Sequence, residues 1–348
     1  MECYINGLGS IGIQSLDFNV RNDEPCVLKS TNKAIHPSYK ELIPAAALRR
    51  MSTSVKMGIY ASHQAMQDAQ VENLDAIITG TGLGCLQDSE KFLDAMIEND
   101  EEYLTPTSFI QSTHNTVAAQ IALQLGCKAY NFTYVNGANS FEAALLDAMI
   151  QITSCNADSA LVGGIDETST QFDRLFQLSG LYKAEDASID FRKPSSPGAC
   201  LAEGANFFVL SNKRDKESYA QLIDVHYFNR PQQTIQLEVE GFLNRNKLNL
   251  NEIDLVFLGY NADSQDQRHF EEYASLFPEI AHAYYQHLSG SFFTASAYGL
   301  KLAAEVLKNQ EVPTNIIYND IKPTQLKTIL LINQSRGVDH SLVLIQSC

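Results

Sequence analysis

Thiols and imidazoles are the side chains of this sequence best suited to covalent chemistry. The chain has seven cysteines and eight histidines. A cysteine becomes a nucleophile when a helix N-terminus or a nearby cation stabilises its thiolate, and histidine is a frequent partner. The cysteines are scattered and form no Cys-x-x-Cys pair, which gives no support to a zinc site or a thioredoxin-type motif. The reactive groups are present, but their spacing singles out none of them.

Two cysteines and two histidines are the candidates for such chemistry. Cys85 follows a cluster of glycines, and Cys200 lies in an apolar stretch, where a buried and inert thiol is the usual outcome. His114 stands in a polar segment before a predicted helix, where capping the helix explains it as well as catalysis does. His287 is the other imidazole that could act with either thiol.

Two glycine clusters could in principle hold a phosphate. Residues 7–12 match the Gly-x-Gly-x-x-Gly pattern of dinucleotide sites, but that mechanism needs a helix at this point. The residues that follow have no helical apolar period. The second cluster, residues 80–84, has Cys85 where a further glycine would be required. We interpret both clusters as tight turns at strand ends.

The charge balance excludes several classes of partner. The chain has 25 Lys and Arg against 41 Asp and Glu, a formal net charge of −16. Nucleic acids and anionic membranes bind clustered basic side chains, so neither is expected as a partner. The sequence shows no secretory signal and no apolar stretch long enough to span a bilayer. No residue spacing resembles a metal site. We therefore expect a cytoplasmic protein with reduced thiols and with no metal or cofactor.

The elements that must position these residues alternate along the chain. Short apolar runs alternate with stretches of helical period, which is typical of an α/β protein. Strands are predicted at residues 3–5, 76–79, 131–135, 159–162, 207–210, 255–258, 316–318, 329–332 and 342–345. Helices are predicted at residues 54–69, 88–98, 116–125, 140–153, 233–244, 267–276 and 295–309.

An internal similarity indicates that one α/β unit is used twice. Residues 73–80 and 252–259 each place an Asp five residues before a Gly, with an apolar run between them. The small-residue helix predicted at 116–125 is similar to the one that begins at 295. The two halves are expected at residues 1–205 and 206–348, within one compact unit. Chance similarity between common α/β segments is the alternative explanation.

An ordered series of short motifs resembles the β-ketoacyl synthases of the thiolase fold. These motifs are Asn6-Gly-Leu-Gly9, Arg50-Met-Ser52 with Lys56, Gly80-Thr-Gly-Leu-Gly84, the segment 105–115, Gly163-Gly-Ile-Asp-Glu167 and Ala202-Glu-Gly-Ala205. The resemblance covers the whole chain, strongly to about residue 210 and weakly after it. It implies a thiolase-like α/β fold, in which a duplicated unit forms five αβαβα layers.

The catalytic positions depart from this family's pattern. Active members use a cysteine at the N-terminus of a buried helix, and the family's spacing places that position at Ala138. The resemblance implies Tyr260 at the first histidine position, with Gln286 and Ser291 at the lysine and second histidine positions. A glycine-rich loop near the C-terminus is replaced by residues 333–338. Without a thiolate there is no acyl-enzyme, so we expect no intact catalytic set.

The resemblance therefore implies a non-catalytic subunit of the chain-length-factor type. Such subunits pair with an active Cys-His-His synthase and help to elongate a polyketide, polyene or fatty-acyl chain on acyl carrier protein. Phe109, Thr113, His114 and Thr116 are the expected residues of the dimer interface or the partner's acyl tunnel. The sequence around His114 is similar to accessory synthases of aryl-polyene or flexirubin-type pathways. Pairing with a second copy of this chain stays open.

The net charge bears on where a carrier protein docks. Carrier proteins are acidic, so a subunit with a charge of −16 repels them in general, and docking is expected on the partner. A local basic patch around Arg49, Arg50 and Lys56 would be the exception.

Two other functions remain. One is an active 3-oxoacyl synthase that uses Cys85 or Cys200, with His114 or His287 as the base. The other is a homodimeric binding or scaffold protein without an acyl substrate, because a fold alone does not determine function.

Overall fold

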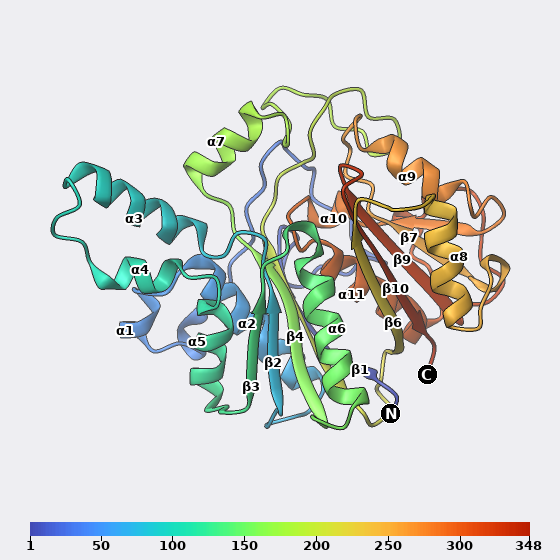
Figure 1. Cartoon of the computed structure of the whole chain (residues 1–348), viewed down its shortest axis with the longest axis horizontal. Coiled ribbons are helices and arrows are strands. Elements are labelled where there is room, and N and C mark those ends of the chain that lie inside the picture. The colour runs from blue at the N-terminus through green and yellow to red at the C-terminus, as the bar shows by residue number, and fades with distance from the viewer.

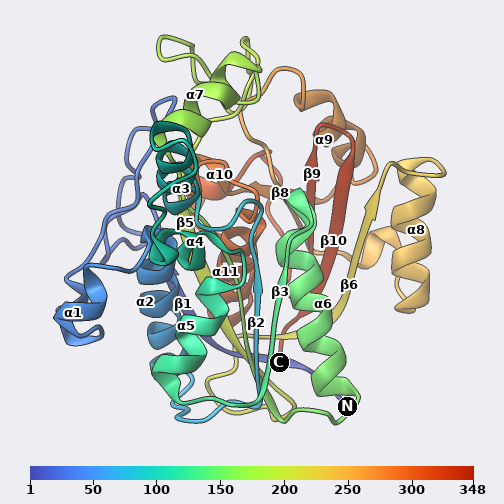
Figure 2. The same cartoon turned by 60° about the vertical axis from the view of Figure 1, so that its left-hand side comes forward.

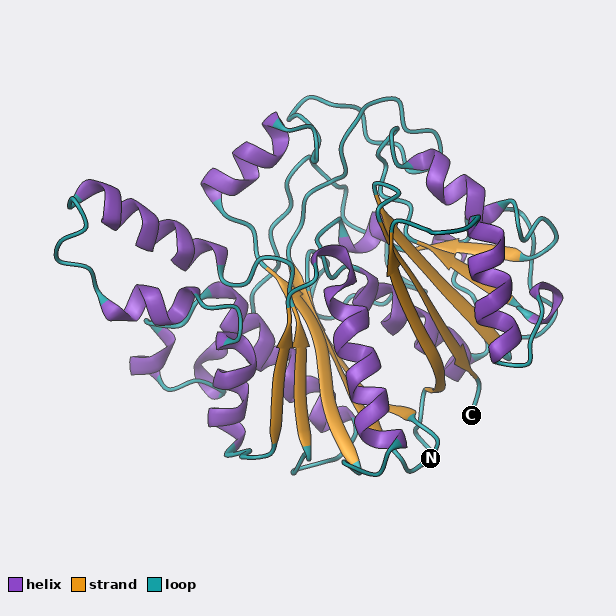
Figure 3. Cartoon of the chain, in the orientation of Figure 1, coloured by secondary structure: helices purple, strands orange, loops and turns teal.

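Ten strands form one extended sheet that is flanked and divided by helices in the computed structural model, which describes all residues from Met1 to Cys348 (Figures 1 and 3). The strands are β1 (Tyr4–Ile11), β2 (Ala76–Gly80), β3 (Tyr130–Tyr134), β4 (Ser159–Asp166), β5 (Gly204–Ser211), β6 (Ala220–Asn229), β7 (Leu255–Leu258), β8 (Ala281–Tyr284), β9 (Thr328–Ser335) and β10 (Asp339–Gln346). The helices are α1 (Ala45–Leu48), α2 (Thr53–Asp68), α3 (Leu86–Glu98), α4 (Pro106–Ser112), α5 (Thr116–Leu125), α6 (Ser140–Thr153), α7 (Thr170–Leu178), α8 (Ile235–Arg245), α9 (Gln267–Ala274), α10 (Gln286–Ser289) and α11 (Ser296–Asn309).

The strand order confirms the duplicated unit. The order is β3-β2-β4-β5-β1 in the first half and, read from the other edge, β8-β7-β9-β10-β6 in the second. In each half three strands pair in parallel and the remaining pairs are antiparallel. Strands β1 and β6 join the halves through two residue pairs only, Tyr4 with Gln221 and Ile5 with Ala220.

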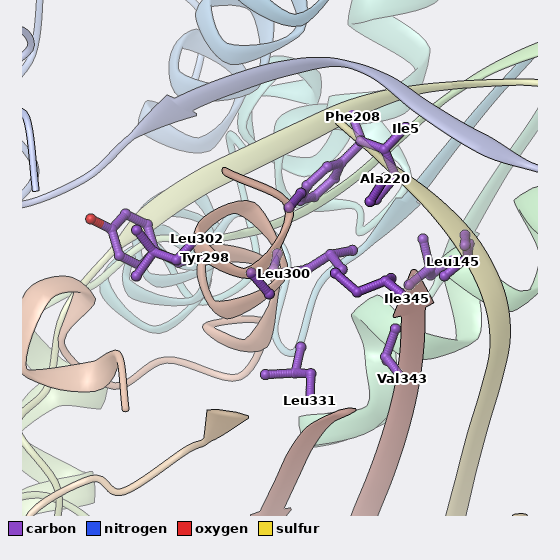
Figure 4. Close-up of a cluster of buried hydrophobic side chains, with 14 of the residues drawn as sticks. Ile5, Leu145, Phe208, Ala220, Tyr298, Leu300, Leu302, Leu331, Val343 and Ile345 are labelled. Atoms are coloured by element: carbon purple, nitrogen blue, oxygen red, sulfur yellow. The ribbon is translucent and has the colours of Figure 1, made fainter. Parts of the chain in front are cut away.

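Three hydrophobic clusters define the layers. The central cluster packs α6 and α11 between the two half-sheets, with Leu145 and Leu300 from the helices against Phe208 and Val343 from the strands (Figure 4). A second cluster packs α2 and α5 on the outer face of the first half-sheet, and a third packs α8 and α9 on the outer face of the second. Helix, sheet, helix, sheet and helix give the five αβαβα layers, so the predicted fold class is confirmed.

Several predicted elements need correction. The sequence analysis predicts neither strands β6 and β8 nor helices α1, α4, α7 and α10. The strand predicted at residues 316–318 is instead the end of a 3₁₀ turn, Thr314–Ile316, and only Ile317 makes an isolated bridge, to Ala283. None of the helices combines the length and apolar character that crossing a bilayer requires.

The internal similarity is correct for the strands and wrong for the helices. Residues 73–80 and 252–259 lead into β2 and β7, which occupy equivalent places in the two halves. Helix α11 lies between β8 and β9, so its counterpart is α6, between β3 and β4, and not α5. Strand β5 runs across residue 205, and the loop 212–219 connects the two five-stranded sets.

The first glycine cluster is not a turn. Gly7 and Gly9 lie inside β1, where a side-chain Cβ would come within 2.2 Å of the Ala65 carbonyl oxygen and 1.9 Å of the Ala61 carbonyl oxygen. Both glycines therefore allow α2 to approach the strand closely, which is a structural role. In the second cluster, Gly80 ends β2 and Gly84 has a left-handed φ of 68°, as the turn interpretation predicts.

Candidate functional site

A cavity of about 360 Å³ lies where both halves meet at the carboxyl ends of their strands. Clefts at this end of an α/β sheet commonly bind ligands. The lining includes Ala138, the residues 179–182 that follow α7, residues after β7, residues around α10 and the end of β9. Most of the 21 lining residues are polar, and none is a cysteine.

Ala138 lies at the N-terminus of a helix, as the resemblance implies. It belongs to a 3₁₀ turn, Gly137–Asn139, that leads directly into α6, and its methyl group lines the cavity. Two residues further on, the hydroxyl of Ser140 is engaged in local hydrogen bonds, because the backbone N–H of Asn136 donates to Ser140 Oγ at 2.8 Å. Ser140 Oγ in turn donates to the Gly137 carbonyl oxygen at 2.7 Å, so this group serves the turn.

Tyr260, expected at the first histidine position, does not line the cavity. Its ring stacks on Tyr318 with centroids 4.1 Å apart and packs in the outer cluster of the second half. Successive side chains at the end of a strand point to opposite faces, so the next residue, Asn261, lines the cavity instead. Its Nδ2 donates to Asp266 Oδ2 at 2.9 Å, and its Oδ1 accepts from the Asp263 N–H at 3.0 Å. Both ends of this amide hold the loop together.

Gln286 and Ser291 do line the cavity, together with Ala138. Gln286 Nε2 donates to the Gly259 carbonyl oxygen at 3.1 Å and ties α10 to the end of β7. An amide and a hydroxyl carry no charge near neutral pH and accept no proton there. The one imidazole of the lining is that of His269 on α9, which the sequence analysis did not single out. Only its place in the fold identifies it.

The two candidate thiols are buried away from the cavity surface. Cys85 and Cys200 have no exposed area, and neither lines the cavity. Burial, with the negative charge of Glu167 added, raises the pKa of Cys85 to about 12. Cys85 nevertheless caps α3, so a helix N-terminus alone does not produce a thiolate here. Burial also raises the pKa of Cys200 to about 11, against a smaller opposite effect of Lys183. Both are protonated at neutral pH.

The remaining predicted residues lie outside the cavity. Phe109 on α4 is 55% exposed and packs against Phe92, with ring centroids 5.4 Å apart. The hydroxyls of Thr113 and Thr116 are 2.8 Å apart and close the turn between α4 and α5. His114 is exposed beside Gly84.

His287, the second candidate base, is half-buried and packs against an aromatic side chain. Its ring stacks on Tyr284 with centroids 3.9 Å apart, and neither ring nitrogen has a hydrogen-bond partner. Burial lowers its pKa to about 4. The imidazole is therefore uncharged near neutral pH, and it does not line the cavity.

Two carboxyl groups, on α6 and at the end of β4, are buried and do not themselves line the cavity. Glu142 is one helical turn beyond Ala138, has no exposed area and accepts a hydrogen bond from Ser341 Oγ at 3.1 Å. Burial raises its pKa to about 7. Asp166, at the end of β4, accepts four hydrogen bonds, from the Thr81 hydroxyl, the Gly82 N–H, and both the N–H and the hydroxyl of Thr294. Burial raises its pKa to about 6.

The raised pKa of Glu142 predicts a specific dependence of stability on pH. The folded chain binds this proton up to about pH 7, whereas the unfolded chain releases it near 4.5. The free energy of unfolding must therefore fall as the pH rises through this interval. We expect Glu142→Gln, measured by urea unfolding, to be more stable than the unchanged protein by about 2–3 kcal/mol at pH 8 and by little at pH 4.5.

The exposed Glu72→Gln provides the control for this measurement, because it removes the same charge from the surface. Its stability should follow the unchanged protein at every pH. An equal pH dependence of unfolding in Glu142→Gln and in the unchanged protein would contradict the assignment of the buried proton to Glu142.

Comparisons with known proteins agree on one family. A family model described as "Beta-ketoacyl synthase, N-terminal domain" matches residues 21–216, more than half of the chain. The chain is similar in structure to "The ishigamide ketosynthase/chain length factor", with a TM-score of 0.82 at 15% identity, over 100% of this chain and 99% of that one. A β-ketoacyl synthase from Burkholderia phymatum STM815 gives a TM-score of 0.83 at 15% identity, over 100% of this chain and 99% of the other.

A third similar structure is a complex of two subunits. It is described as a ketosynthase, ApeO, in complex with its chain length factor, ApeC, from Xenorhabdus doucetiae. The TM-score is 0.78 at 14% identity, with 100% of this chain and 98% of the other covered. At these identities the three structures bear on the fold alone.

Proposed function

The chain belongs to the β-ketoacyl synthase family, and from that membership we propose that it is a non-catalytic subunit of the chain-length-factor type. It pairs with an active synthase during acyl-chain elongation on acyl carrier protein. The observation that carries this proposal is the cavity at Ala138, which contains a helix N-terminus but no thiol. The resemblance around His114 favours an accessory synthase of aryl-polyene or flexirubin-type pathways within this class.

The polar replacements in the cavity support the loss of catalysis. Condensation requires a nucleophile that holds the acyl group and charged or hydrogen-bonding groups that stabilise the developing enolate. Ala138 offers only a methyl group, and both ends of the Asn261 amide are engaged within its own loop. Gln286 is held by the backbone of Gly259. These side chains maintain the shape of a former reaction site without its reactivity.

The open edge of the first half-sheet supports pairing with another chain. Strand β3 is the outermost strand of its sheet, and Tyr130 and Phe132 on it are 40% and 47% exposed. An open, apolar edge strand is a template for pairing with a second strand. Exposed Leu123 on α5 and Ile150 on α6 flank it. The arm formed by α3 and α4, residues 86–112, projects beside this edge and carries Phe109 (Figure 1).

An active synthase is the partner proposed for this edge. Two copies of this chain would assemble a dimer without a nucleophile in either cavity, whereas an active partner supplies the missing cysteine and histidines. Co-expression with the β-ketoacyl synthase encoded nearest to this chain, followed by size-exclusion chromatography, tests the pairing. One shared peak is expected, and two peaks that never merge would count against the heterodimer.

The rival proposal, an active enzyme that uses Cys85 or Cys200, predicts a covalent intermediate. We expect the pure chain to form no thioester when it is incubated with acyl carrier protein charged with a radiolabelled acyl group, because both thiols are buried and protonated. Ala138→Cys is the matched positive control, since it restores a thiol at the N-terminus of α6. Peptide mapping then separates labelling of the introduced thiol from labelling of the exposed Cys26, Cys155 and Cys348.

A stable thioester on Cys85 or Cys200 of the unchanged chain would overturn the proposed function. Loss of the labelled product in Cys200→Ser would have the same meaning. Labelling confined to the Ala138→Cys variant is the expected result.

A further inference from the structure

We propose that the cavity at Ala138 binds a small phosphorylated sugar. The site consists of two buried amides, those of Gln286 and Gln334, and of two arginines, Arg268 and Arg336. All four residues line the same cavity. The inference goes beyond the function proposed above, because it requires neither an acyl group nor a partner subunit.

Each of the two buried amides has one end without a hydrogen-bond partner. Gln286 and Gln334 are 5% and 4% exposed. Gln286 Nε2 donates to the Gly259 carbonyl oxygen at 3.1 Å, and its Oε1 has no partner. Gln334 Oε1 accepts from the Gly337 N–H at 2.8 Å, and its Nε2 has no partner. The bonds to the backbone fix both orientations, so the cavity offers one free acceptor and one free donor.

The two unpartnered atoms define the chemistry of the ligand. Buried polar atoms without a partner are rare in folded proteins, because they lose their hydrogen bonds to water without replacement. A ligand that satisfies both atoms offers a donor to Gln286 and an acceptor to Gln334. A hydroxyl group can do either, so a molecule with several hydroxyls can do both at once. A hydrocarbon chain can do neither.

The rest of the lining also suits a hydrophilic ligand. Most ligand pockets are lined mainly by apolar side chains, whereas this lining is mainly polar. Asp263 uses Oδ1 to accept from the Gln265 N–H at 2.8 Å, which leaves its other carboxylate oxygen for a hydroxyl donor. Phe293 adds an aromatic surface. The volume of about 360 Å³ is at the small end of the range of ligand pockets, so the ligand is small.

The two arginines provide the place for a phosphate. Arg268 and Arg336 are exposed and form no ion pair, although the chain has a net charge of −16. Helix α9, which carries Arg268, lies beside the turn between β9 and β10, which carries Arg336 (Figures 1 and 2). A Cβ at Gly337 in this turn would lie 2.4 Å from His269 Cε1 on α9. A guanidinium group binds two phosphate oxygens at once, so this pair favours a phosphorylated ligand.

Isothermal titration calorimetry with the full chain tests this binding. The probes are glucose 6-phosphate and ribose 5-phosphate, and the comparison ligands are glucose, inorganic phosphate and phosphopantetheine. We expect one of the two sugar phosphates to bind with a Kd below about 1 mM and at least tenfold more tightly than every comparison ligand. Binding of any comparison ligand that is as tight would overturn the proposal, and so would the absence of binding by both sugar phosphates.

Removal of both rim charges tests the place of the phosphate. Arg268→Gln with Arg336→Gln should weaken the binding of the sugar phosphate at least tenfold, because the phosphate loses both cations. Lys213→Gln with Arg214→Gln is the matched control, since it removes two exposed basic charges in the loop between β5 and β6. Its affinity should change less than twofold. Equal affinities of the two double variants would overturn the proposal.

Gln334→Glu tests the buried donor. The variant keeps Oε1 for the Gly337 N–H but replaces the free Nε2 donor by an acceptor, so at least a tenfold loss of affinity is expected. Circular dichroism verifies that each variant is folded, and an unchanged affinity in a folded Gln334→Glu would overturn the proposal. A thioester on the chain's own cysteines would overturn the proposed function and leave these measurements valid.

Discussion

We expect Asp166→Ala to lower the free energy of unfolding by about 4 kcal/mol, because it leaves four buried hydrogen-bond donors without an acceptor. Two of these donors belong to the glycine loop after β2, and two belong to Thr294 at the start of α11. The carboxylate therefore connects the two halves at the level of the cavity. Urea unfolding followed by circular dichroism measures the effect.

Two further variants test whether the lost hydrogen bonds cause the drop in stability. Asp166→Asn keeps one acceptor oxygen, so roughly half of the loss is expected. Asp320→Ala removes an exposed carboxylate, and little change is expected there. Equal stabilities of Asp166→Ala and Asp320→Ala would show that this network does not hold the halves together.

The second large effect is expected at the open edge of β3. Phe132→Asp should weaken pairing with the proposed partner, an active synthase, at least 100-fold, because it places a charge within an apolar strand edge that would be buried in the proposed complex. Phe132 also packs against Tyr134, with ring centroids 4.9 Å apart, and it stacks on Tyr130. The substitution therefore removes the middle one of three aromatic rings on β3. Co-purification and sedimentation of the mixed subunits measure the change.

Leu237→Asp is the control for the β3 variant. Leu237 on α8 is 51% exposed, similar to Phe132, but it lies on the other half of the molecule. Its pairing should be unchanged. If Phe132→Asp co-purifies with the synthase as well as Leu237→Asp does, the interface lies elsewhere.

The regular elements of the first half could be predicted from the sequence because their patterns are local. Helices α5 and α6 begin and end at the predicted residues, since small and apolar residues recur there with helical period. Strand β6 escaped prediction because Asp224 and His226 interrupt its apolar residues. Such polar side chains are stable on the strand only where the tertiary structure supplies partners. Arg245 is one of these partners, since its Nε lies 2.6 Å from Asp224.

The candidate site was predictable only in part, because some of its residues are brought together by the tertiary fold alone. The family resemblance placed Ala138, Gln286 and Ser291, and the structure brings all three to one cavity. At the end of β7, a shift of one residue moves a side chain from the cavity to the outer hydrophobic cluster. The sequence alone does not show which residue faces the cavity. His269 joins the lining from α9, which only the tertiary fold brings close.

The position of β5 in the sheet delays the completion of the first half-sheet during folding. Strand β5 lies between β4 and β1, and it pairs Leu8 with Phe208 and Gly9 with Phe207. During synthesis β1 leaves the ribosome first, yet its partner follows about two hundred residues later. Contacts of such long range slow folding, since loop closure must precede the gain in pairing. A nascent chain that stops at residue 205 lacks nearly all of β5, so the first half-sheet closes only once synthesis has passed residue 211.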